Sequence, residues 1–116
     1  MKIERHDVAA RMSKVVIHGD TVYLAGIVAN EPKGKSVTEQ TKDIVAQIDG
    51  LLAMAGSDKS KLLSATIYIT DMANFAEMNS VWDTWVVPGN TPARATVEAK
   101  LATPDYKVEI MVVAAR

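Results

Sequence analysis

The chain has 116 residues, of which 48% are hydrophobic and 23% are charged, and it contains no cysteine. Its 13 basic and 14 acidic residues leave a net charge of −1, without the basic excess that nucleic-acid or anionic-membrane binding normally requires. The lack of cysteine excludes disulfides, thiolate zinc sites and cysteine nucleophiles. We therefore expect a single domain over residues 1–116 in a cytoplasmic protein that binds neither nucleic acid nor a membrane.

Two short strands are predicted in the N-terminal quarter. Val15–His18 and Val22–Ala25 are rich in β-branched and apolar residues, and Gly19–Thr21 between them tolerates tight-turn dihedrals. This pattern predicts a hairpin. Residues 1–11 mix charges without the apolar core of a signal peptide, and no strand is predicted there.

Two amphipathic helices are predicted next. Ser36 and Glu39 match a capping box, so the first helix should begin near Val37, and Gly56 stands where a left-handed cap ends a helix. The second helix should end at Pro88–Asn90. Large apolar side chains recur along it at i, i+3, i+7 and i+10, and such a stripe is more often core than ligand pocket. They are Phe75, Met78, Trp82 and Trp85.

Three further strands, Leu62–Thr70, Arg94–Leu101 and Lys107–Ala115, complete the pattern. The element order β-β-α-β-α-β-β predicts an α+β domain with a mixed sheet. Right-handed crossovers would put both helices on one face of that sheet. The other face then needs cover, which a partner subunit would supply.

Glu109 is the most unusual residue of the last predicted strand. An ionised carboxylate in a buried strand costs several kcal/mol unless a partner or a wet cavity satisfies it. The alternative is that the strand lies at a sheet edge and turns Glu109 to solvent. Met111 and Val113 share the strand face of Glu109 and disfavour that alternative.

Arg94 is the second candidate, at the start of an apolar strand and two residues after Pro92. Its guanidinium could hold a carboxylate in bidentate fashion, or it could simply be solvated. If the last two strands formed a hairpin, Arg94 and Glu109 would lie on opposite faces, roughly 16 Å apart. A shared site then requires either that these strands are not adjacent or that the two residues meet across a subunit boundary.

The segment Pro92–Ile110, PARATVEAKLATPDYKVEI, resembles the signature of the Rid family, the YjgF/UK-type enamine/imine deaminases. Ser13–His18, Ala65–Ile67 and Trp82–Val87 are most similar to the YoaB-type branch of that family. The resemblance implies a chorismate-mutase-like fold assembled as a homotrimer, with clefts between subunits. It also implies hydrolysis of enamines and imines, such as 2-aminoacrylate and 2-iminopropanoate, to 2-keto acids and ammonia. No cofactor or metal is expected.

The resemblance also assigns roles to three residues of the signature. Arg94 would clamp the substrate carboxylate, and Glu109 would position or activate the water that attacks the imine carbon. The backbone carbonyl of Thr96 would hold the substrate nitrogen. These residues form the expected catalytic and binding centre.

Other family positions differ in this sequence. The Ser-Gly pair after the second strand corresponds to Ala25 and Gly26, and the upstream tyrosine corresponds to Met12. The pocket asparagine matches Asn79, which on pattern alone would be a solvated helix residue. Two pocket side chains are thus replaced, which leaves the identity of the substrate open and allows a larger or more apolar imine.

A different class of function stays open beside hydrolysis. The same cleft could hold a small carboxylate, such as a 2-keto acid, without turnover, as a binding or regulatory module. Nuclease or translation-inhibitory activity is attributed to some family members. The balanced charge of this chain gives that activity little physical support.

Overall fold

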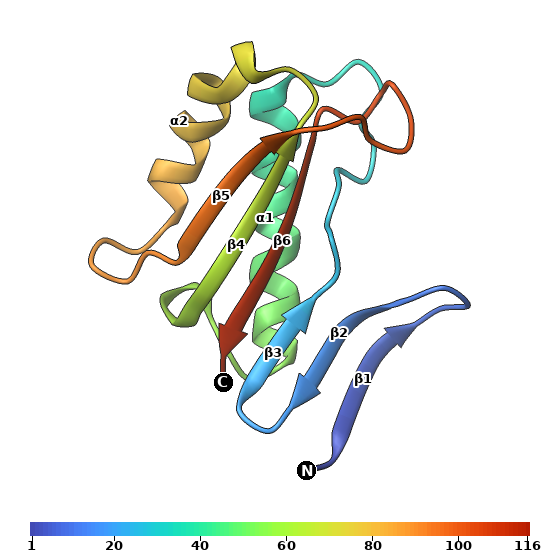
Figure 1. Ribbon diagram of the computed structural model, residues 1–116, viewed down its shortest axis with the longest axis vertical. Helices are drawn as coiled ribbons and strands as arrows, with labels where there is room; N and C mark the ends of the chain where they lie inside the picture. The colour runs from blue at the N-terminus through green and yellow to red at the C-terminus, as the bar shows by residue number, and fades with distance from the viewer.

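Six strands form one mixed sheet in the order β1-β2-β3-β6-β4-β5 (Figure 1). The structure is a computed structural model that describes residues 1–116. β4 and β5 run parallel, whereas the other neighbouring strands run antiparallel, so the mixed sheet is confirmed. The strands are Ile3–Val8 (β1), Ser13–His18 (β2), Thr21–Leu24 (β3), Leu62–Ile69 (β4), Ala93–Glu98 (β5) and Val108–Ala115 (β6).

The N-terminal strand β1 corrects the predicted element order, which begins one strand too late. β1 pairs antiparallel with β2 from Ile3 opposite His18 to Val8 opposite Ser13. Its sequence, IERHDV, is charged and mostly exposed, so it lacks the apolar alternation of a half-buried strand. It forms a strand because its backbone pairs with the free edge of β2. The residues of β1 carry no local pattern that predicts this pairing.

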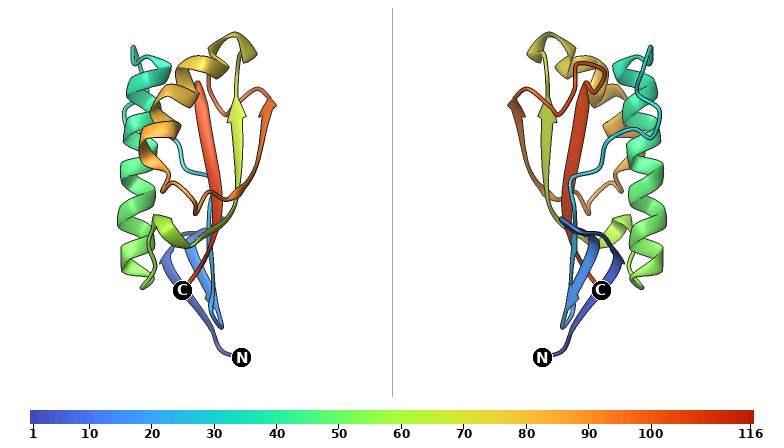
Figure 2. Two further views of the ribbon diagram at one scale, coloured as in Figure 1. Left: turned by 90° about the vertical axis from the view of Figure 1, so that its left-hand side faces the viewer. Right: turned by 90° about the vertical axis from the view of Figure 1, so that its right-hand side faces the viewer.

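Both helices, α1 (Val37–Met54) and α2 (Phe75–Trp85), cover the same face of the sheet, as predicted (Figure 2). The capping box is present, because Ser36 Oγ accepts from the N–H of Glu39 at 3.1 Å and Glu39 Oε1 accepts from the N–H of Ser36 at 3.2 Å. The hydrogen bond from the backbone N–H of Ser36, together with the Ser36 side chain, lowers the pKa of the Glu39 carboxyl. Short 3₁₀ turns at Lys59–Lys61 and Met72–Asn74 precede β4 and α2.

Side chains from both helices fix α1 and α2 against each other. Glu77 Oε2 accepts from the N–H and from Oγ1 of Thr38, both at 2.8 Å, so an acidic group of α2 caps the first turn of α1. Farther along, Trp85 Nε1 donates to Asp49 Oδ1 at 3.0 Å. The two contacts set the orientation of α2 and therefore the face that it presents to β5.

The core lies between the helices and the sheet and contains 23 buried apolar residues. Met78, Trp82 and Trp85 belong to this core, as the stripe predicted, but Phe75 is 37% exposed. None of the helices is both long and apolar enough to cross a membrane. The opposite face of the sheet has no helix over it (Figure 2). Large apolar side chains exposed on strands of that face are Tyr23, Val97 and Met111.

Candidate functional site

Arg94 lies on β5 with its side chain directed toward α2. In the parallel register it pairs with the buried Ala65, which puts it on the helix-covered face of the sheet. Its Nη1 donates to Asn79 Oδ1 at 2.8 Å, and its Cζ lies 5.8 Å from the ring centre of Phe75 and 5.5 Å from that of Trp82. An exposed arginine is thus oriented by one hydrogen bond and two cation–π contacts rather than merely solvated.

Asn79 is half-buried and uses its amide oxygen on Arg94. Phe75, Asn79 and Trp82 are spaced at i, i+4 and i+7 on α2, so one face of the helix carries all three. A guanidinium has five N–H donors, and only one of those of Arg94 is used within the chain. The remaining donors can form the two parallel bonds that a carboxylate accepts.

The backbone carbonyl of Thr96 points to the unpaired outer edge of β5. The N–H of Ala99 donates to Ile69 O at 3.0 Å, so the backbone groups of Ala99 face β4. The N–H and C=O of successive residues alternate in direction along a strand, so those of Val97 also face β4. The N–H and C=O of Thr96 face outward, where the sheet has no further strand. The Thr96 carbonyl is therefore a free acceptor two residues from Arg94. The Thr96 hydroxyl oxygen is also buried without a hydrogen-bond partner.

Glu109 lies on β6, between β3 and β4 in the sheet, and not on an edge strand. It is half-buried on the face away from the helices, together with Met111 and Val113. No side chain or backbone group forms a hydrogen bond or ion pair with its carboxylate. A methyl group added to Gly26 would overlap that carboxylate, so the glycine provides the space that Glu109 occupies.

Arg94 and Glu109 do not share a site within one chain. The hairpin considered for the last two strands does not form, because β4 lies between β5 and β6. Tyr68 of β4 is opposite both Val97 and Glu109. Three residues along β5 and two strand spacings then separate the Cα atoms of Arg94 and Glu109 by about 14 Å. Their side chains also lie on opposite faces, so a common site needs a second copy of the chain.

A shallow depression of about 180 Å³ is lined by Met12, Gly26 and Tyr106, among others, and Gly26 also borders the Glu109 carboxylate. Ala25 is half-buried next to it and donates its N–H to Lys14 O at 2.9 Å. Tyr106 was not among the predicted site residues. Its only signal in the sequence is its position in the signature segment, three residues before Glu109.

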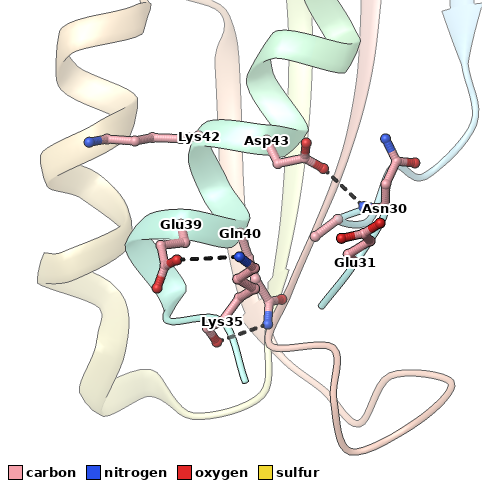
Figure 3. Close-up of a pocket in the computed structure, with 8 residues that line it drawn as sticks. Asn30, Glu31, Lys35, Glu39, Gln40, Lys42 and Asp43 are labelled. Atoms are coloured by element: carbon pink, nitrogen blue, oxygen red, sulfur yellow. Dashed lines mark hydrogen bonds and ion pairs between the residues drawn. The ribbon is translucent and has the colours of Figure 1, made fainter. Parts of the chain in front are cut away.

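The largest hollow in the chain, about 420 Å³, includes no predicted site residue (Figure 3). It lies beside the start of α1, where Lys35 forms an ion pair with Glu39 at 3.8 Å and Asp43 accepts from the N–H of Asn30 at 2.9 Å. Acidic and basic groups alternate around it and several are already paired, so the hollow has no marked preference for a charged ligand.

Comparisons with known proteins identify relatives of this chain over nearly its whole length. The family model described as Endoribonuclease L-PSP matches residues 2–116. The RutC family protein YoaB of Escherichia coli is 50% identical over 99% of this chain and 99% of its own length, and a RutC family protein of Haemophilus ducreyi is 45% identical over 97% and 96%.

Solved structures extend the match to the fold. The crystal structure of a YjgF-family member from Neisseria meningitidis is 46% identical, with a TM-score of 0.96 over 100% of this chain and 96% of that one. A Rid-family protein from Yersinia pestis is 26% identical, with a TM-score of 0.86 over 94% and 90%. The near full-length matches in sequence and structure show that this chain belongs to the YjgF/Rid family.

Proposed function

We propose that the protein hydrolyses short-lived imines and enamines derived from amino acids to 2-keto acids and ammonia. The observation that carries this proposal is the state of Arg94, whose guanidinium is oriented by Asn79 and two aromatic rings while most of its donors stay free. A substrate with a carboxylate next to a planar C=N group fits this arrangement. Its carboxylate can bind the Arg94 guanidinium while its imine N–H donates to the nearby free carbonyl of Thr96.

The reaction then follows from the three groups. Arg94 binds the carboxylate, the Thr96 carbonyl accepts from the imine N–H, and Glu109 accepts a proton from water as the water oxygen bonds to the imine carbon. The nitrogen takes up the electron pair of the C=N bond and the proton that Glu109 accepted from water, which gives a carbinolamine. Glu109 then takes the hydroxyl proton and passes it to the nitrogen as the C–N bond breaks, so ammonia leaves and the carbonyl of the 2-keto acid forms.

The site would be built by neighbouring copies in a homotrimer. Arg94 and Glu109 lie on opposite faces of the sheet, about 14 Å apart at their Cα atoms, so one copy offers only half of the site. The exposed apolar side chains of Tyr23, Val97 and Met111 lie on the face that bears Glu109. A neighbouring copy that covers this face would bury them and bring its own Arg94 to Glu109.

The test generates imines in situ with a serine or threonine dehydratase, or with an amino-acid oxidase, and follows release of the 2-keto acid. The protein should accelerate release. Arg94→Ala should lose about 1.5 to 3 kcal/mol of transition-state stabilisation, hence roughly tenfold or more in rate. Glu109→Gln should slow turnover without changing assembly. No acceleration with any imine, or an Arg94→Ala variant as active as the parent, would refute the proposal.

A second candidate is a non-catalytic module that holds 2-keto acids in the same cleft. It is favoured by the absence of a hydroxyl at Met12 and Ala25 and by the lack of a partner for Glu109. Calorimetry separates the two functions. Binding of a 2-keto acid that depends on Arg94, with no hydrolysis of any imine, would select the module.

A further inference from the structure

Gln40 is a fully buried polar residue in the first turn of α1 that joins three segments of the chain. Figure 3 shows it beside Lys35. Its Nε2 donates to three backbone carbonyls, those of Pro32 at 3.2 Å, Lys35 at 3.3 Å and Asp105 at 2.9 Å. Its Oε1 accepts from the N–H of Lys107 at 3.0 Å. Both polar ends of the side chain are therefore satisfied in the interior.

Two of these four contacts have no substitute elsewhere in the chain. The carbonyl of Pro32 also accepts from the N–H of Lys35 at 3.0 Å, and the carbonyl of Lys35 also accepts from Lys107 Nζ at 2.9 Å. The carbonyl of Asp105 and the N–H of Lys107 have Gln40 as their only partner. Gln40 alone thus satisfies the carbonyl of Asp105 and the N–H of Lys107, and it is the group that ties these two backbone positions to α1.

This anchored segment leads directly to the proposed water-binding half of the site. Tyr106, between the two anchored residues, lines the depression with Met12 and Gly26. Lys107 is also held from the other side, because its carbonyl accepts from the N–H of Thr70 at 3.1 Å. β6 begins at the next residue, and Glu109 follows two residues after Lys107.

We propose that Gln40 is a positioning residue that sets Tyr106 and Glu109 through its two contacts with residues 105–107. The catalytic part of this inference rests on the proposed function. Without Gln40, a carbonyl and an N–H would be left unsatisfied, and the segment would shift toward water to recover hydrogen bonds. A small displacement of Glu109 slows attack by water, whereas Arg94 on β5 keeps its carboxylate contacts. Gln40 therefore acts on kcat and leaves binding of the substrate carboxylate unchanged.

Gln40→Met tests the inference, because methionine has a similar volume and makes no such hydrogen bonds. The matched control is Thr41→Val, since Thr41 is equally buried on the same helix but its hydroxyl donates only to Val37 O of that helix, at 2.7 Å. We expect Gln40→Met to lower kcat by about tenfold or more, with 2-keto acid affinity within about twofold of the parent. Amide hydrogen exchange of residues 105–109 should accelerate in Gln40→Met only.

Gln40→Glu provides a second variant in case Gln40→Met does not fold. Burial favours its protonated form, which keeps the acceptor for the N–H of Lys107 and one donor. Its kcat relative to the parent should therefore be high at low pH and fall as the pH rises, a change that a purely structural role would not produce.

Three results would overturn the inference: kcat equal in Gln40→Met and Thr41→Val, equal losses of kcat and of 2-keto acid affinity, or unchanged exchange of residues 105–109. Inactivity of the parent toward every imine would instead overturn the proposed function. The exchange experiment needs no substrate, so it separates these two failures.

Discussion

Mixing two impaired variants gives a direct test of whether Arg94 and Glu109 act together across a subunit boundary. Their side chains lie on opposite faces of the sheet, and their Cα atoms are about 14 Å apart from the strand register. Arg94→Ala and Glu109→Gln each damage a different half of the site. When equal amounts are unfolded and refolded together, each site draws its two halves from equal pools, so about one quarter of the sites regain both native residues.

The matched control mixes the parent with a chain that carries both substitutions. If each site takes its halves from different copies, about one quarter of the sites in that mixture are intact; if both halves come from one chain, about one half are. The assay is the initial rate of 2-keto acid release from an in situ generated imine, relative to an equal amount of refolded parent. No recovery in the first mixture, together with about half the parental rate in the second, would refute the shared site.

Three further predictions concern single side chains. Gly26→Ala should keep the fold but lower kcat by roughly tenfold or more, because the new methyl group displaces the Glu109 carboxylate. Far-UV circular dichroism checks the fold and the imine assay checks kcat. Parental activity would contradict the prediction. Asn79→Ala should weaken 2-keto acid binding by about five- to tenfold in calorimetry, since one hydrogen bond that orients Arg94 is lost; equal affinity would contradict the orienting role. The pKa of Glu39 is lowered from its ordinary value of 4.5 by hydrogen bonds from the backbone and side chain of Ser36, so its contribution to stability is present above that value and is lost as the pH falls below it. Glu39→Gln should therefore be less stable than the parent at pH 7 in urea, and the difference should shrink as the pH falls below 4.5. A difference independent of pH would contradict this reasoning.

Features that depend on neighbouring residues could be predicted from the sequence. The capping box of Ser36 and Glu39 and the left-handed Gly56 mark the ends of α1 because helix termini are satisfied by nearby side chains and by backbone freedom. The buried stripe of α2 follows from helical periodicity. Arg94 and Glu109 could be singled out because a charge in an apolar strand is unusual whatever the fold.

Features that depend on distant partners could be decided only by the tertiary structure. β1 exists because β2 offers a free edge, and the last two predicted strands are separated because β4 inserts between them. Neither effect leaves a local pattern, since strand pairing joins segments through backbone groups that every residue carries.

The candidate site shows the same division. The sequence by itself determined which side chains could perform the chemistry, because charge and polarity belong to the residue. Only the tertiary structure decided that Arg94 and Glu109 lie on opposite faces, that Asn79 orients Arg94, and that Gln40 holds residues 105–107. The directions of these side chains and the distances between them arise from the packing of the helices on one face of the sheet. That packing depends on contacts between residues far apart in the chain.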